Sequence, residues 1–301
     1  MSARLLNNPI RLAVTCLAGL NLLCGGTEAN LHASDAQEIE ARLKQDYLSK
    51  NVLVRGLYHG DQLDYDEQGN FIEGGVPGVW TLDGIVTLTD FKSRGDRLEI
   101  SADRTVIGFS YQHRRVYALP DKPVEIIVHF GPTIPARGGL AEVMSRIFML
   151  DTSKLPQYAP AYWLPILTDE AWAQYAKDRR QLPAGLTIFA PVNAPDGEAV
   201  YFTDGEPHDG LEPPQPVDEP PPYYPEVARQ LKKRGTVLMA VLIDRAGAVH
   251  DALLLGDPLG DGLDQSSVNT VRRWKYRPAT RSGAAVNVIK PEPVTFSIGR
   301  H

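Results

Sequence analysis

A proline-rich, acidic run near the middle of the chain, residues 195–222, most limits what these 301 residues can fold into. It holds eight prolines and eight acidic residues but no Lys or Arg. Such a segment buries too little apolar surface to offset its ordering entropy, and its like charges repel one another. We therefore predict a semi-rigid acidic linker over residues 191–222, between folded units at residues 31–190 and 223–301.

The two predicted units carry opposite net charge. Residues 221–301 contain 12 Lys and Arg against 7 Asp and Glu, whereas the residues before them contain 19 against 30. Hydrophobic residues make up 43% of the chain and charged residues 23%, which is the composition of an ordinary globular protein. Both units are therefore expected to have a packed core.

The first 30 residues have the pattern of an export signal. Arg4 and Arg11 are followed by an apolar run over residues 12–26, which is short for a membrane span. We expect a signal peptide cut after Ala29 or Ala33, and a location in the periplasm or cell envelope. An uncleaved inner-membrane anchor is the alternative, and lipid attachment at Cys24 is a weaker one.

Cysteine and motif content argue against several kinds of chemistry. The two cysteines, Cys16 and Cys24, both lie in the signal segment, so a cleaved chain has no thiol. Asp64 and Asp66 are spaced as in a calcium loop, but the twelfth position is Gly75 rather than Glu, which favours a hairpin turn. No catalytic motif stands out. We expect no catalytic residue, no metal, no cofactor and, for an exported chain, no nucleic-acid partner.

The unit before the linker is predicted to be an antiparallel, β-rich domain with covering helices. A helix is expected over residues 35–47, and alternating apolar residues predict strands over 79–88 and 124–130. Turn sequences at 66–70 and 93–97 bound such strands. Two further helices are expected, over residues 139–150 and 168–180. We can name no family for residues 35–190.

The last eighty residues predict a small α+β domain in the order helix, strand, strand, helix, strand. The first helix, over 225–234, begins at a proline and is expected to end in a left-handed Gly235. A strand apolar on both faces (236–244) and a return strand (249–257) follow. Asp264 is a suitable N-cap for the second helix, and a final strand runs to residue 298. The simplest arrangement packs two helices on a three-stranded antiparallel sheet.

This domain resembles the TonB C-terminal domain family of energy-transducer proteins. The resemblance covers about residues 221–301 and rests on a Tyr-Pro pair, a glycine-led strand, a Trp-x-Tyr-x-Pro-Ala motif and a terminal Val-x-Phe. The residues that match, which we expect to have structural roles, are Tyr224, Pro225, Ala228, Gly235, Gly247, Trp274, Tyr276, Pro278, Ala279 and Gly283, with Asp244, Val294 and Phe296 beside them.

The resemblance implies a function in energy-coupled transport across the outer membrane. Members bind the TonB box, a short receptor segment, by adding it as a strand to the edge of the domain, and a proton-driven inner-membrane motor grips their N-terminal helix. A sheet edge offers unpaired N–H and C=O groups for such β-augmentation. The residues expected to bind the partner are Val286, Asn287, Val288, Ile289, Val294 and Phe296.

Two features of the sequence depart from the family pattern. Pro291 and Pro293 delete two backbone donors and predict that the last strand divides into two shorter segments. Cleavage of residues 1–30 would leave the motor no helix to hold. The alternative function is therefore a soluble periplasmic scaffold that uses the same binding module without motor coupling, and a homodimer is also open.

Overall fold

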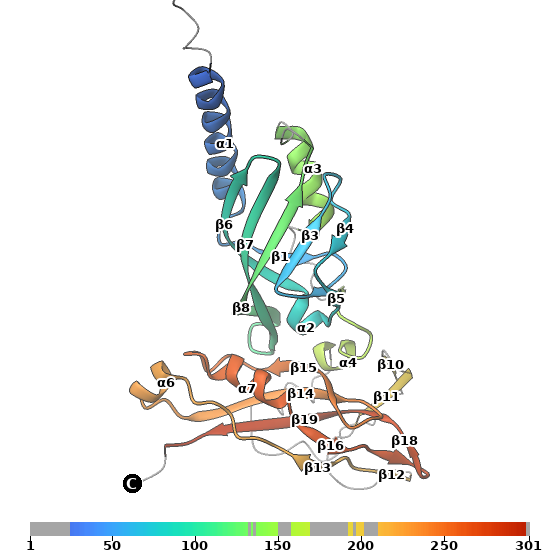
Figure 1. Ribbon diagram of the computed structural model, residues 1–301. Coiled ribbons are helices and arrows are strands. Elements are labelled where there is room, and N and C mark those ends of the chain that lie inside the picture. The colour runs from blue at the N-terminus through green and yellow to red at the C-terminus, as the bar shows by residue number, and fades with distance from the viewer. Residues whose placement is uncertain are drawn as a thin grey trace, which may run out of the picture.

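The computed structural model describes residues 25–131, 134, 137–149, 158–168, 192–194, 197–201 and 210–298. The predicted signal segment up to residue 24 and the predicted helix over 168–180, apart from Thr168, lie outside these residues. Among the residues that are described, no helix combines the length and the apolar character needed to cross a membrane. Figure 1 shows an upper lobe built from the N-terminal half and a lower lobe built from the C-terminal half.

The upper lobe is a mixed α+β unit around one strongly twisted sheet (Figure 1). Its long strands pair antiparallel, β6 with β7 and β7 with β8, and β3 joins β8 in parallel. Its helices are α1 (Gly25–Tyr47), α2 (Trp80–Asp83), α3 (Arg137–Ile147) and α4 (Leu164–Thr168). Its strands are β1 (Asn51–Val54), β2 (Tyr58–His59), β3 (Gln62–Tyr65), β4 (Phe71–Glu73), β5 (Val76–Pro77), β6 (Ile85–Arg94), β7 (Arg97–Ser110), β8 (Arg115–His129) and β9 (Phe148–Met149).

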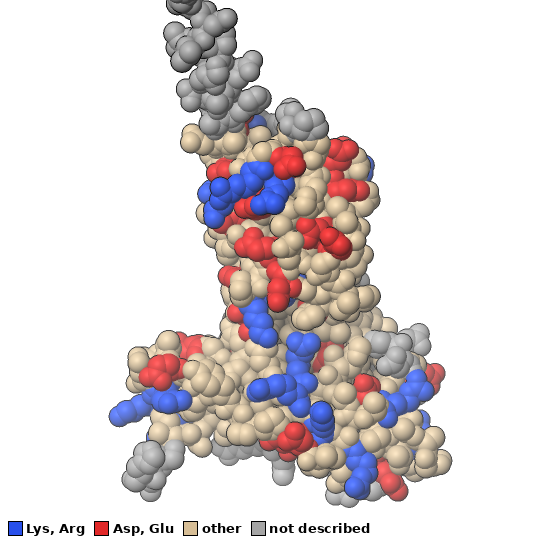
Figure 2. All heavy atoms as spheres, in the orientation of Figure 1, with Lys and Arg blue, Asp and Glu red and all other residues tan. Residues whose placement is uncertain are grey.

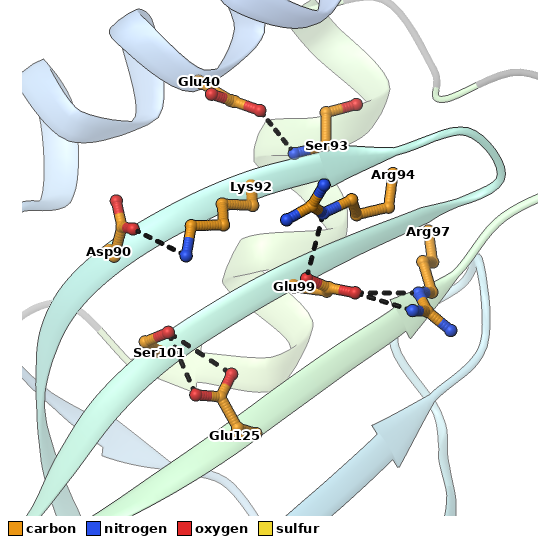
Figure 3. A network of polar contacts seen from close by, with 9 residues as sticks. All are labelled: Glu40, Asp90, Lys92, Ser93, Arg94, Arg97, Glu99, Ser101 and Glu125. Carbon is orange, nitrogen blue, oxygen red and sulfur yellow. Dashed lines mark hydrogen bonds and ion pairs between the residues drawn. The ribbon is translucent and has the colours of Figure 1, made fainter.

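The two faces of this sheet differ as the alternating sequence predicts. Val124, Ile126, Val128 and Phe130 are buried against α1 and α3, which supply Leu43 and Met144 among others. The opposite face of β6, β7 and β8 carries a polar network in which Glu99 contacts both Arg94 and Arg97 (Figure 3). Lys and Arg of this lobe gather mainly near its upper end in Figure 2, and Asp and Glu are spread over the rest of the face in view. These strands have one solvated face, but the expectation of an antiparallel sheet is only partly correct, because β3 pairs with β8 in parallel.

The predicted strand over residues 79–88 is only partly correct. Trp80–Asp83 forms the helical turn α2, and the strand begins at Ile85. The turn is closed by the Asp83 carboxylate, which accepts the N–H of Val79 at 2.9 Å and a guanidinium N–H of Arg104 at 3.2 Å. A buried polar contact thus overrides the period-two pattern, which a sequence alone cannot reveal.

The lower lobe has the predicted order of helix, strand, strand, helix, strand, with short strands added. Its sheet pairs β14 antiparallel with both β15 and β19. The elements are α6 (Glu226–Gln230), β14 (Gly235–Ile243), β15 (Val249–Leu255), α7 (Leu263–Val271), β16 (Lys275–Arg277), β17 (Thr280–Arg281), β18 (Ala284–Ala285) and β19 (Asn287–Phe296). β19 is continuous, so the expected division at Pro291 and Pro293 does not occur.

The C-terminal end of α6 and the N-terminal end of α7 differ from the predicted capping. Lys232, with φ 51°, is the left-handed residue after α6, whereas Gly235 has φ 153° and starts β14. Gly262, with φ 82°, precedes α7, and Asp264 lies in its first turn. The Asp264 carboxylate instead accepts the N–H groups of the loop before it. Several residues near each end suit a cap, so composition alone misplaces it by a few positions.

Residues within the predicted spacer form strands instead. They are β10 (Val192–Ala194), β11 (Gly197–Tyr201), β12 (Leu211–Glu212) and β13 (Gln215–Asp218). β11 pairs with β19, β12 with β17 and β13 with β16. Short apolar runs such as Ala199–Tyr201 find partners in the lower lobe, and these contacts offset the ordering cost that the composition suggests. Residues 192–218 are therefore not a free linker where they are described.

The two lobes share one sheet. Leu254 and Leu255 of β15 pair in parallel with Gly108 and Phe109 of β7, so the strand order runs β10-β11-β19-β14-β15-β7-β6-β1-β9. The backbone N–H of Gly256 continues this contact to the carbonyl of Phe109 at 3.0 Å. Residues 158–168 cover the face of the lower sheet opposite α6 and α7. This second cover explains why β14 is apolar on both faces.

A buried carboxylate lies at the junction between the lobes. Asp251 of β15 is 0% exposed and accepts hydrogen bonds from Tyr162 Oη at 3.0 Å, Trp163 Nε1 at 2.9 Å and the N–H of Ala252 at 2.8 Å. The hydroxyl of Thr81 in α2 donates to it as well. Burial raises the pKa of Asp251 above its ordinary 3.8, although these four donors act in the opposite direction.

This raised pKa predicts that the contribution of Asp251 to the free energy of unfolding depends on pH. The folded protein binds the Asp251 proton more tightly than the unfolded chain does, so the contribution of Asp251 to stability is greatest below about pH 3.8 and declines as pH rises from there. Asp251→Asn loses one acceptor and should be less stable than the wild type at low pH, by about 1–3 kcal/mol. That difference should shrink towards pH 7. Denaturant unfolding across this range measures it, and a difference that grows with pH would contradict the assignment.

Gly247 sits in the turn between β14 and β15 and tolerates no side chain. Its φ is +82°, and a Cβ there would lie 1.8 Å from the carbonyl oxygen of Tyr276. Gly283 has nearly the same φ, +84°, but no atom lies within 4 Å of a Cβ built on it. Substitution of Gly283 therefore measures backbone strain alone, whereas substitution of Gly247 adds a steric contact to the same strain.

We expect Gly283→Ala to lower the free energy of unfolding by about 1 kcal/mol, the cost of left-handed backbone for alanine. Gly247→Ala should lower it by at least about 2 kcal/mol more, because the carbonyl of Tyr276 must move. Denaturant midpoints at constant m-value measure both. Equal losses for the two variants would show that the close approach at Gly247 is unimportant.

Candidate functional site

The outer edge of β19 is the place where the sequence predicts partner binding. The ladder between β19 and β14 runs without a register shift from Val288, opposite Ile243, to Phe296, opposite Gly235. Pro291 and Pro293 lie within it although neither has an N–H. The odd-numbered residues of β19 must therefore direct their backbone groups away from β14, since alternate residues of an antiparallel strand bond to opposite sides. The outward amides nearest the start of β19 are those of Asn287 and Ile289.

The protein's own strand β11 occupies the first part of this edge. It runs parallel to β19, with Ala199 opposite Asn287, Val200 opposite Val288 and Tyr201 opposite Ile289. β10 then pairs antiparallel with the far side of β11. Figure 1 shows β10 and β11 at the right-hand end of the lower sheet. The segment that holds this edge comes from the region predicted to be a linker.

The predicted partner-binding residues fall into two groups. Val288, Ile289, Val294 and Phe296 are at most 3% exposed, so their side chains hold the lobe together and only their backbone can reach a partner. Val286 precedes β19, and its N–H donates to the carbonyl of Ala279 at 3.0 Å. Partner binding by these six residues stays a prediction.

Asn287 is the polar member of that set, and its side chain bridges the turn after β14 and the strand β11. Its Oδ1 accepts the N–H of Arg245 at 3.0 Å, and its Nδ2 donates to the carbonyl of Glu198 in β11 at 3.3 Å. Asn287 is 2% exposed. Both contacts are to main-chain atoms, so neither depends on the side chain of Arg245 or of Glu198.

Beyond Ile289 the outer edge of β19 has few main-chain donors. Pro291 and Pro293 present carbonyl oxygens but no N–H, and Thr295 exchanges a hydrogen bond with Thr236 through its hydroxyl at 2.9 Å. A strand added along this half could form few main-chain bonds. Residues 287–289 are therefore the part of the edge best equipped for strand pairing.

A polar cluster lies on the α7 side of β19, next to this edge. Tyr276 Oη donates to Glu292 Oε1 at 2.9 Å, and Lys290 Nζ contacts the same carboxylate oxygen and lies 5.3 Å from the Tyr276 ring centroid. Burial raises the pKa of the Tyr276 hydroxyl, and the negative charge of Glu292 raises it further. The phenol therefore stays protonated and acts as a donor that fixes Glu292.

The Tyr-Pro motif fixes the loop at the start of the lower lobe. Tyr224 donates its hydroxyl to the carbonyl of Lys233, and its ring meets that of Phe296 edge-on at 5.4 Å. The carbonyl of Pro225 accepts the N–H of Arg229 at 2.9 Å, and Ala228 is the fully buried residue of α6. These contacts hold the segment before α6 against α6 and the end of β19.

The Trp-x-Tyr-x-Pro-Ala motif ties the region after α7 to the segment before α6. Trp274 Nε1 donates to the carbonyl of Pro220 at 3.0 Å. The N–H of Tyr276 donates to the carbonyl of Gly247 at 2.8 Å. The ring of Pro278 lies 3.5 Å from a Cβ built at Gly247. Ala279 is 0% exposed and packs in the core beneath α6 and α7.

Two histidine–carboxylate pairs in the upper lobe were not expected from the sequence. His59 Nδ1 lies 2.7 Å from Asp83 Oδ1, and His129 Nε2 lies 2.6 Å from Asp64 Oδ1. The first pair shares Asp83 with Arg104 and so belongs to the contacts that close α2. Across the described residues, no three His, Cys, Asp or Glu side chains gather as a metal site. The strands bring these partners together from distant positions, which leaves no local signal.

Comparison with known proteins finds matches in the lower lobe. A family model described as the C-terminal region of the Gram-negative bacterial TonB protein matches residues 220–298. Protein TonB of Vibrio cholerae is 30% identical over 77 residues, which cover 26% of this chain and 32% of that protein. Protein tonB2 of Pseudomonas aeruginosa is 29% identical over 82 residues, which cover 27% and 30%. The chain thus spans about a third of the length of these relatives.

The solution NMR structure of the Pseudomonas aeruginosa TonB CTD aligns at a TM-score of 0.27 and 20% identity, over 31% of this chain and 92% of that one. The sequence match extends from Pro220 to Ile298 and so includes α6, β14, β15, α7 and β19. Residues 220–298 therefore belong to the TonB C-terminal domain family.

Proposed function

We propose that residues 220–298 bind an extended segment of an outer-membrane receptor, the TonB box, by strand addition at the outer edge of β19. The protein then takes part in energy-coupled transport across the outer membrane, in the cell envelope. The family match over residues 220–298 is the observation that carries this proposal. That family is one of energy transducers rather than enzymes, and its members interact with outer-membrane receptors and inner-membrane complexes.

The geometry of the edge supports the same mode of binding. The outward amides of Asn287 and Ile289 can bond a peptide backbone, and the Asn287 side chain can bond a further carbonyl of it. Main-chain bonds of this kind give affinity with little dependence on side chains. The net charge of +5 over residues 221–301 suits an acidic receptor segment.

Strand addition predicts a response of alternating residues in the peptide. In a synthetic TonB-box peptide, N-methylation of one residue whose amide faces β19 should weaken binding about tenfold, because a main-chain bond is lost and the methyl group enters the ladder. N-methylation of the next residue, whose amide faces away, should change affinity little. Calorimetric titration of the full chain measures both peptides, and backbone amide shifts at Asn287 and Ile289 locate the site.

Two results would contradict strand addition at β19. Equal affinity of both methylated peptides and the unmodified one would exclude main-chain pairing. Shift changes confined to α6 and α7 would place the peptide on the helical face instead.

A second candidate function is a periplasmic scaffold that uses the same module without motor coupling. The pairing of β7 with β15 favours it, because the lower lobe is built into a larger sheet with the upper lobe. N-terminal sequencing of the protein recovered from the cell envelope separates the two functions. A soluble chain that begins near residue 30 would favour the scaffold, and a membrane-held chain that begins at residue 1 would favour motor coupling.

A further inference from the structure

The strand that lies on the candidate edge has the features of a bound peptide. β11 (Gly197–Tyr201) is short, runs parallel to β19 and pairs with it only from Asn287 to Ile289. β14, by contrast, pairs with β19 from Val288 to Phe296. β11 is thus the partner of β19 that is held by fewer main-chain bonds.

The backbone of β11 meets the outward groups of β19 at one residue. In a parallel pair, a residue that faces its partner bonds to the residues before and after the one opposite it. Asn287 and Ile289 face outward, opposite Ala199 and Tyr201. Val200 therefore bonds to both of them: its N–H points to the carbonyl of Asn287, and its carbonyl points to the N–H of Ile289. The Asn287 side chain adds its bond to the carbonyl of Glu198.

The side chains of β11 alternate between the two faces of the lower sheet. Ala199 and Tyr201 enter the core beneath residues 158–168, where Tyr201 Oη donates to the carbonyl of Tyr162 at 2.5 Å. Val200 enters the opposite core, beneath α6 and α7. All three are at most 4% exposed. The edge therefore accommodates a small residue, a β-branched residue and an aromatic residue in that order.

We propose that β11 is an intramolecular stand-in for the partner strand, and that it must leave β19 before a partner binds there. The partner is an extended peptide that runs parallel to β19 and offers a small, an aliphatic and an aromatic side chain in succession. This inference rests on the proposed function, since it assigns the ligand chemistry and the regulation of the same edge. A tethered strand competes at an effective concentration of about millimolar, so it sets a threshold for partner affinity.

The test uses the full chain with Val200→Pro, which deletes the N–H that points to Asn287. Val200→Thr is the matched control, because it keeps that N–H and the β-branched shape. The probe is the capped peptide Gly-Glu-Ala-Val-Tyr, the sequence of residues 197–201, titrated beside a TonB-box peptide. Val200→Pro should bind the probe at least about tenfold more tightly than the wild type and Val200→Thr do. Amide shifts at Asn287 and Ile289 report the site.

The outcomes separate this inference from the proposed function. Tighter binding of both peptides to Val200→Pro supports both. Tighter binding of the probe with no binding of the TonB-box peptide supports release of β11 and overturns the receptor function. Equal binding of the TonB-box peptide to all three proteins, with shifts at Asn287 and Ile289, overturns the stand-in role and leaves the function. No shift at this edge with either peptide overturns both.

Hydrogen exchange in the wild type tests the same release if Val200→Pro does not fold. The amide of Ile289 faces β11 and that of Val288 faces β14, so release of β11 alone exposes only the first. Ile289 should exchange at least about tenfold faster than Val288, because a short strand opens without the rest of the sheet. Equal exchange rates would mean that β11 leaves only when the whole sheet unfolds, and would overturn the proposal.

Discussion

The parallel pairing of β15 with β7, and the burial that accompanies it, joins the two lobes in the described part of the chain. It places the lower sheet against residues 158–168, so that β14 and β15 are covered on both faces. Asp251 is part of the same contact, because its buried carboxylate collects donors from α2 and from the segment before α4. Breaking this junction would expose apolar surface and leave those donors without an acceptor.

The sequence predicts the elements of each lobe better than it predicts their connection. Period-two patterns located β8, and the order of elements from α6 to β19 followed from alternation and from the Tyr-Pro and Trp-x-Tyr motifs. The apolar run of β14 already required two covers, but nothing in the sequence named residues 158–168 as the second one. Contacts between distant segments decide such pairings, and a single sequence does not carry them.

The linker prediction failed for a related reason. Composition indicates only how much apolar surface a segment can bury within itself. β11 instead buries Ala199, Val200 and Tyr201 against residues of β14, β15 and β19. At the candidate edge, the sequence located residues 287–289 correctly as a strand. It could not show that their side chains face inward, or that β11 lies beside them. Asn287 was recognised only as a member of the strand, and its contact with Glu198 appears only in three dimensions.

The prolines of β19 have a consequence for how copies of this protein behave at high concentration. An exposed edge with a full set of donors can template another molecule, and successive additions build fibrils. Along the stretch from Pro291 to Pro293 the edge offers acceptors alone, so a strand of a second copy would form few main-chain bonds there. The same two prolines that limit the candidate site to residues 287–289 therefore also disfavour pairing of this edge with a second copy of the protein.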